Sequence, residues 1–181
     1  YYQSWNRQVK DQATKDEVYT QELLMKQAKI SVNDRKVVPV AMATAEERHC
    51  AACALELPDG TIVTGKTTDL LGPCSAVLLN AIKTLGGIAD GLHLISPTYI
   101  NPIQGLKTEY LGSKNPRLHT DEVLIALSMC AATDSLAKLA LEQLPKLRGC
   151  QMHVTNMLSN ADAKTLNKLG IQVTNEPVYE N

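Results

Sequence analysis

Apolar positions are sparse at the start of the chain and become regularly patterned further on. Between Tyr2 and about Lys29 they fall loosely on one side of a segment rich in Gln, Lys, Glu and Asp, which predicts a polar, partly packed helix. Val37 to Ala43 is a short β-branched run, typical of a strand. Ala51 to Thr64 then holds two apolar segments separated by Pro58-Asp59-Gly60, and this pattern predicts a β-hairpin.

Helical signals dominate the middle of the chain. Gly72-Pro73 precedes an apolar stretch and Gly86-Gly87 follows it, which are the positions that proline and glycine favour at the two ends of a helix. Ser96 to Leu111 is punctuated by prolines and is expected to be a connection. Thr120 is placed to cap the helix that follows. The predicted helices run over Ser75 to Leu85, Asp121 to about Ala132, and Ser135 to Leu144.

The end of the chain predicts a strand, a helix and a second strand. An apolar strand near Gln151 to Thr155 leads into a helix from about Asn160 to Leu169, and Ile171 to Val173 follows the next glycine. A βαβ unit this short implies that its two strands pair in parallel. We therefore expect a three-layer α/β sandwich over residues 36–181, behind a helical arm formed by residues 1–35.

Composition narrows the class of protein. The chain has 181 residues, of which 44% are hydrophobic and 20% charged, enough for one sizeable core. A net charge of -1 and an aromatic content of 4% provide neither a basic field nor stacking platforms, so nucleic acid is not an expected partner. No long apolar run and no charged-then-apolar leader occurs, so we expect neither a membrane span nor a signal peptide. Five cysteines, an odd number, indicate reduced thiols in the cytoplasm, and a start at Tyr1 without Met suggests a piece of a longer polypeptide.

The segment GSKNPRLHTDE, Gly112 to Glu122, concentrates the side chains best suited to chemistry. Arg117 offers a planar five-donor guanidinium suited to phosphate or carboxylate, and His119 can transfer protons near neutral pH. We predict that Asn115, Arg117 and His119 cluster beside the N-terminus of the helix that begins near Asp121, facing a cleft that can hold an anion. The two carboxylates at the end of the segment either face that cleft, which would suit a cation or proton transfer instead, or simply offset the helix dipole. The candidate ligand-binding residues are Lys114, Asn115, Arg117, Asp121 and Glu122, and the candidate catalytic residue is His119.

Cysteine offers two further candidates. Cys74 begins a predicted helix, where the helix dipole would lower the thiol pKa toward a nucleophilic thiolate, but small apolar cysteines are also common in cores. Cys50 and Cys53 form a CxxC that Cys150 and His153 would have to complete as zinc ligands. A separation of roughly a hundred residues between the pairs fits no standard zinc module, so we predict no zinc site.

Three segments carry a resemblance to a known family. They are LPDGTIVTGKTTDLLGP, PIQGLKTEYLGSKNPRLHTDEVLIAL and LNKLGIQVTNEPVY, and the stretch from Pro102 to Leu127 is the most specific of them. Over its whole length the chain resembles the C-terminal part of a family of uncharacterised bacterial proteins, domain of unknown function 1846.

That resemblance implies a longer protein, with a phosphate-loop-like Gly-rich segment in its missing N-terminal half and an α/β sandwich similar to the cytidine-deaminase fold in the present part. Zinc deaminases need a His or Cys followed two residues later by Glu at one helix start, and P-C-x-x-C at the next. Here Pro73-Cys74-Ser75-Ala76 has Ala in place of that Glu and no P-C-x-x-C occurs, so deamination is not expected. Members have also been labelled ATP-dependent peptidases, but the chain has no H-E-x-x-H, no Ser-Lys motif and only Gly65-Lys66-Thr67 of a P-loop.

Two functions are open at this point. In the first, the loop from Asn115 to Glu122 is part of a pocket for a small anionic metabolite such as a nucleotide, completed by the missing N-terminal half, with no cofactor identified. In the second, the region is an assembly module whose arm and βαβ tail hold the subunits of a homo-oligomer together. The first predicts that Arg117 and His119 lie in a concave pocket, and the second predicts a large apolar surface on the arm.

Overall fold

The computed structural model describes residues 1–9 and 15–179, so residues 10–14 of the predicted N-terminal helix lie outside the description. The elements in chain order are α1 (Tyr2–Val9), α2 (Lys15–Gln27), the 3-10 turn η1 (Val32–Asp34), α3 (Val37–Arg48), β1 (Ala52–Glu56), β2 (Ile62–Lys66), α4 (Pro73–Leu85), α5 (Pro97–Gly105), the π-helical turn η2 (Leu106–Tyr110), α6 (Thr120–Ala131), α7 (Ser135–Leu141), the 3-10 turn η3 (Leu144–Leu147), β3 (Gln151–Val154), α8 (Asn160–Lys168) and β4 (Gln172–Asn175). The four strands form one mixed sheet in the order β2-β1-β3-β4. Strand β1 pairs antiparallel with β2 and β3, and β3 pairs parallel with β4, which confirms the predicted α/β class, the hairpin and the βαβ unit.

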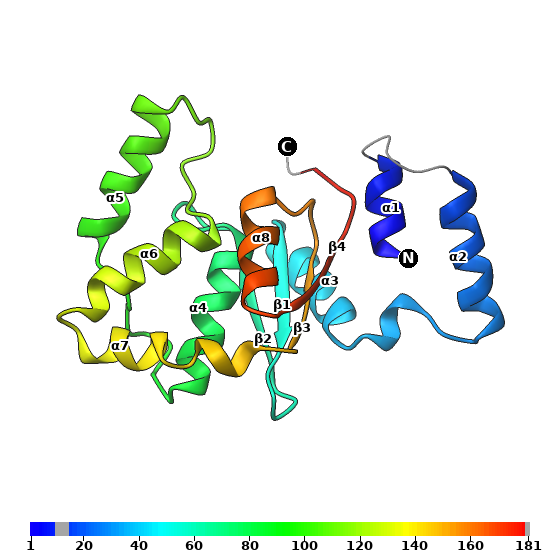
Figure 1. The fold of residues 1–181 in the computed structure, drawn as a ribbon, viewed down its shortest axis with the longest axis horizontal. Coiled ribbons are helices and arrows are strands. Elements are labelled where there is room, and N and C mark those ends of the chain that lie inside the picture. Colours follow the sequence, from blue (N-terminus) through cyan, green and yellow to red (C-terminus); the bar gives the residue numbers. More distant parts are fainter. Residues whose placement is uncertain (10–14, 180–181) are drawn as a thin grey trace.

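Helices cover both faces of the sheet (Figure 1). On one face α3 packs through Val37 and Ala41 against Ala54 of β1. The next residue of β1, Leu55, points to the other face and joins the main core, which also contains residues of α4 and α8. Complete burial of a leucine such as Leu55 stabilises the fold by about 1.5–3 kcal/mol. In the two described ranges of the chain, no helix is both long and apolar enough to cross a bilayer.

Helix α3 contradicts the strand predicted from Val37 to Ala43. Val37, Val38 and Ala41 are all buried and recur at the spacing of one helical face. Pro39 lies in the first turn, where a helix does not use the missing N–H. Packing against β1 therefore overrides the strand propensity of the valines.

The predicted connection from Ser96 to Leu111 is also helical. Pro97 is the first residue of α5, where its fixed φ suits a helix, and Ser96 Oγ accepts the Thr98 N–H at 3.3 Å as a cap. The chain then passes through η2, where Lys107 is buried. Pro97, expected to punctuate a connection, instead begins a helix that leads toward the candidate site, and Pro102 lies inside that helix.

Helix α1 packs against strand β4, at the edge of the sheet opposite β2 (Figure 1). The buried ring of Tyr2 lies with its centroid 5.0 Å from that of His153. Asn6 Nδ2 donates to Asn175 Oδ1 at 2.9 Å. The start of the chain is thus tied to its last strand, while the domain boundary expected between residues 35 and 36 stays a prediction.

A buried polar network continues from that contact. Both ring nitrogens of His153 are engaged, Nδ1 by Thr174 Oγ1 at 2.9 Å and Nε2 by Glu176 Oε1 at 3.1 Å. Arg35 donates to the same Thr174 oxygen from the segment between η1 and α3. Complete burial, followed by the nearby charge of Arg35, lowers the pKa of His153 to about 4, so the neutral ring is part of the fold.

Candidate functional site

The predicted site segment lines a cavity of about 710 Å³ beside the first residues of α4 and α8. We call it the helix-end cavity. Its lining residues are Asp69, Gly72, Pro73, Cys74, Lys114, Asn115, Pro116, Arg117, His119, Asn156, Met157, Leu158, Ser159 and Asp162.

Arg117 and His119 face this cavity because of the residue between them. Leu118 is fully buried and pairs with Leu71 in a short parallel bridge. In extended backbone the two neighbours of an inward-pointing residue point the other way. The turn before them is closed by the Arg117 N–H, which donates to Asn115 Oδ1 at 3.1 Å. The structure thus brings Asn115, Arg117 and His119 together at one concave wall.

His119 is held by a buried carboxylate. Its Nδ1 lies 3.1 Å from Asp162 Oδ2, and Ser159 Oγ donates to the same oxygen at 2.6 Å. Burial alone would raise the pKa of Asp162, but hydrogen bonds from His119, Ser159 and the Thr120 N–H outweigh it and lower the pKa. The bond to Asp162 in turn raises the pKa of His119. His119 Nδ1 is already hydrogen-bonded to Asp162. No residue that the structure describes bonds to Nε2, so Nε2 is the ring nitrogen available to a ligand.

Two cations line the cavity near His119. Arg117 Nε donates to the Thr68 carbonyl at 2.9 Å, which anchors the base of the guanidinium to the turn that precedes α4. Lys114 is exposed at the rim. Within the described ranges neither of them forms an ion pair, so both charges are available to an anion.

Asp121 and Glu122, predicted as ligand-binding residues, do not line the cavity. Glu122 Oε2 accepts Lys107 Nζ and the His119 N–H, each at 2.8 Å. Asp121 Oδ1 accepts the Glu122 N–H at 2.9 Å. Their carboxylates therefore organise the start of α6, which is the alternative that the sequence left open.

The cap predicted for α6 is wrong. The residue before the helix is His119, and the Thr120 hydroxyl is buried with no hydrogen-bond partner among the described residues. The Thr120 N–H donates to Asp162 Oδ1 at 2.8 Å, so carboxylates of the protein already satisfy the first N–H groups of α6. An anion in the cavity must rely on side chains and on the starts of α4 and α8, rather than on α6 as expected.

The structure does not support Cys74 as a nucleophile. Cys74 touches the cavity but is only 3% exposed, and its hydrogen bond with Cys53, together with burial, raises its pKa instead of lowering it. All five cysteines are free thiols. Across residues 1–9 and 15–179, no three His, Cys, Asp or Glu side chains gather in a way that could hold a metal ion.

Sequence reasoning missed Ser159 and Asp162. The motif from Ser159 to Asp162 is an S-x-x-D pattern, which marks a helix start and does cap α8 through a bond from the Asp162 N–H at 3.1 Å. The pattern does not reveal that this helix start adjoins His119, which lies 43 residues earlier. Only the tertiary structure shows the pairing.

Comparison with known proteins identifies relatives of this chain. A model described as "Domain of unknown function DUF1846, C-terminal" matches residues 33–181. A UPF0371 protein of Corynebacterium diphtheriae is 52% identical over 158 residues, covering 87% of this chain and 32% of the relative. A UPF0371 protein of Streptococcus uberis is 50% identical over 160 residues, with 88% and 32% covered, and one of Streptococcus pyogenes serotype M5 is 46% identical over 181 residues, with 100% and 37% covered.

These names state no activity for the relatives. The chain spans about a third of their length, so the part outside it is larger than the half that the sequence led us to expect. The match over residues 33–181 and the identities near one half confirm the resemblance: the chain belongs to the DUF1846 family, whose C-terminal domain it contains.

Proposed function

We propose that the helix-end cavity is part of a binding site for a small anionic metabolite and that His119 is its proton-transferring group. The observation that carries the proposal is that buried Asp162 holds His119 in a cavity whose wall also presents Arg117 and Lys114 without ion-pair partners in the described chain. The rest of the longer protein completes the site.

The chemistry of Lys114, Arg117 and His119 favours a phosphate ester or a carboxylate as the ligand. The Nη atoms of Arg117 form a fork that matches two oxygens of such a group. His119 Nε2 donates to an anionic oxygen when the ring is protonated and accepts a proton when it is neutral. Because the pKa of His119 is raised, the cationic form persists to higher pH than in an isolated histidine. The charge of Asp162 is already met by three hydrogen bonds, while Asp69 at the exposed rim opposes anion binding.

A screen of nucleotides and sugar phosphates against the full-length protein tests the site. A ligand that raises the melting temperature is then titrated by calorimetry. Arg117→Ala is expected to weaken its binding by about 1.5–3 kcal/mol, which is roughly tenfold to a hundredfold in Kd, with little change in melting temperature. Arg148→Ala, at an exposed arginine outside the cavity, is the matched control. A loss of stability rather than of binding in Arg117→Ala, or an equal loss in the control, refutes the proposal.

Asp162→Asn tests how His119 is controlled. An amide at position 162 keeps an acceptor for the Thr120 N–H but removes the charge that stabilises the imidazolium, so the pKa of His119 is expected to fall. An NMR titration of the imidazole measures that pKa. In Asp162→Asn, anion binding is therefore expected to weaken at a lower pH than in the wild type. An unchanged midpoint would mean that Asp162 does not set the protonation of His119.

We also propose assembly as a second candidate function, because α2 and the residues after it expose large apolar side chains. Tyr19, Leu23, Leu24 and Ile30 are 67%, 43%, 56% and 54% exposed. A homo-oligomer that buries them is expected to shift toward monomer in the variant Leu24→Ser/Ile30→Ser, measured by sedimentation velocity of the full-length protein. Leu136→Ser on α7 serves as the control, and a monomeric wild-type protein excludes this candidate.

The likeness to the cytidine-deaminase fold is likewise a proposal. What supports it is a mixed sheet with α3 on one face and α4 on the other. An experimental structure that superposes poorly on a deaminase would exclude it.

A further inference from the structure

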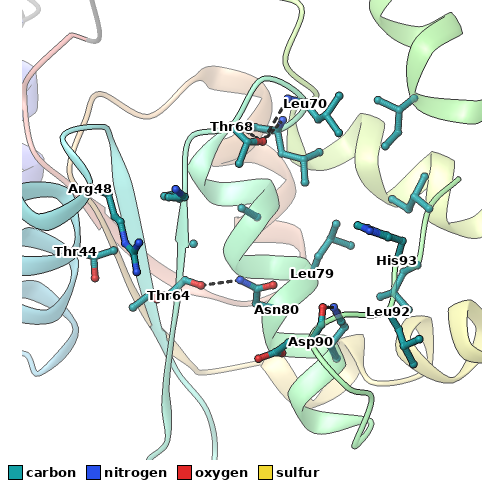
Figure 2. Close-up of a pocket in the computed structure, with 18 of the residues that line it drawn as sticks. Thr44, Arg48, Thr64, Thr68, Leu70, Leu79, Asn80, Asp90, Leu92 and His93 are labelled. Atoms are coloured by element: carbon teal, nitrogen blue, oxygen red, sulfur yellow. Dashed lines mark hydrogen bonds between the residues drawn. The ribbon is translucent and has the colours of Figure 1, made fainter. Parts of the chain in front are cut away.

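A second cavity, of about 560 Å³, lies along the edge strand β2, on the far side of the turn formed by residues 68–71 (Figure 2). We call it the edge-strand cavity. It lies between the end of α3, β2, α4 and the loop of residues 90–95. It shares no lining residue with the helix-end cavity, and its volume is in the range of small-molecule sites.

The walls of the edge-strand cavity combine polar and apolar side chains. Figure 2 shows Thr44 and Arg48 of α3 on one side, and Leu79 and Leu92 together with Asp90 and His93 on the other. The free edge of β2 lies between them, and it is partly closed because Asn80 Nδ2 donates to the Thr64 carbonyl at 2.8 Å. A side chain that occupies the strand edge disfavours the addition of another strand there. The space suits a compact molecule with one polar end and one apolar end.

Lys83 is an independent sign of an anionic ligand. It lines this cavity from α4 and is only 7% exposed. Its Nζ donates to the backbone carbonyl of Asp90 at 2.5 Å, and within the described ranges Lys83 forms no ion pair. A buried ammonium that meets one neutral acceptor is poorly compensated for the water it has lost. A carboxylate or a similar group would supply the missing charge.

The other charged residues that line the edge-strand cavity also favour an anionic ligand. Arg48, Lys66 and Lys83 are opposed by Glu47 and Asp90, which leaves one cation in excess when His93 is neutral. The Glu47 carboxylate is already paired with Arg48 at 3.3 Å. The field at the entrance therefore attracts anions rather than cations.

We propose that the edge-strand cavity binds a small amphipathic anion, with its anionic head at Lys83 and its apolar body against Leu79 and Leu92. This site is separate from the one proposed for the helix-end cavity. Octanoate and octanol are matched probes, because they share the apolar chain and differ in the charge of the head group.

In the full-length protein, calorimetry is expected to show octanoate binding at least about tenfold tighter than octanol, the difference expected for a hydrogen bond between charged groups. Lys83→Met keeps the volume and removes the charge, so it is expected to abolish this preference without lowering the melting temperature. Lys138→Met, at an exposed lysine of α7, is expected to change neither quantity. A second variant, Leu92→Asp in the loop, places a negative charge in the apolar wall and is expected to weaken octanoate binding by about tenfold.

The proposal is overturned if the two probes bind equally, or if Lys83→Met binds octanoate as tightly as the wild type. If Lys83→Met does not fold, the test rests on Leu92→Asp. Octanoate binding to Leu92→Asp that is as tight as in the wild type also overturns the proposal. Arg117→Ala is expected to leave octanoate binding unchanged. A loss in that variant would place octanoate in the helix-end cavity instead.

Discussion

Gly65 of β2 lies so close to α4 that no larger residue fits between them. A Cβ added at Gly65 would lie 2.2 Å from Val77 N, 2.7 Å from Val77 Cα and 2.8 Å from Ala76 C. All three neighbours are backbone atoms, so no change of rotamer can relieve the contact. We predict that Gly65→Ala forces α4 away from the sheet.

The cost follows from these distances. Non-bonded heavy atoms prefer separations near 3.5–4.0 Å, so α4 must move by roughly 1–1.5 Å at this point. The movement loosens the packing of Val77 and Leu78, both fully buried. Overpacking of a well-packed core typically costs about 1–3 kcal/mol, and contact with backbone puts this site at the upper end. A loss of about 3 kcal/mol corresponds to a fall of roughly 6–12 °C in melting temperature for a domain of this size.

Melting temperature and hydrogen exchange of the β2 and α4 peptides measure the effect. Both peptides are expected to exchange faster in Gly65→Ala. The control is Gly91→Ala, where nothing lies within 4 Å of the added Cβ and φ is not positive; its stability is expected to stay within about 0.5 kcal/mol of wild type. If Gly65→Ala has the same melting temperature as Gly91→Ala, the close approach of α4 to β2 in this structure is wrong.

Two further predictions concern buried charge. As the pH falls from 6.5 to about 4, the unfolded chain takes up a proton that buried His153 resists, so the folded state is expected to lose about 3 kcal/mol over that window and nothing above it. The free energy of unfolding measured in urea should depend less on pH in this range for His153→Gln than for wild type, and an equally steep dependence in the variant would contradict a neutral, buried His153. Lys107→Met breaks the ion pair between the buried ammonium of Lys107 and the partly exposed carboxylate of Glu122, and it is expected to lower the free energy of unfolding measured in urea by about 2 kcal/mol. Adding Glu122→Gln to it should recover part of the loss, and no recovery would mean that the pair is not coupled.

The parts of the fold that could be predicted from sequence are those set by local signals. The turn at Pro58-Asp59-Gly60 and the helix start at Gly72-Pro73 carry their own backbone preferences, and both lie where expected. Val37 and Pro97 show the limit of such signals. A valine run forms a helix when it can pack on a sheet, and a proline begins a helix as readily as it ends one.

The candidate site shows the same limit. Arg117 and His119 could be identified as site residues because the guanidinium and imidazole groups have characteristic chemistry wherever they lie in the fold. Asp162 could not be assigned to them, since its role depends on the starts of α6 and α8 meeting in space. Lys83 carried no sequence signal at all, because a lysine on a helix is usually solvated and only burial makes this one unusual.

The contact between α1 and β4 sets an order of events during synthesis. Asn6 and Asn175 are 169 residues apart, and ribosomes add about 5–20 residues per second, so roughly ten to thirty seconds separate the appearance of the two partners. Through that interval the Tyr2 ring lacks the His153 surface on which it packs. Helix α1 is therefore expected to be among the last of these elements to dock, and a ribosome-bound chain that ends before β4 should leave α1 open to proteolysis.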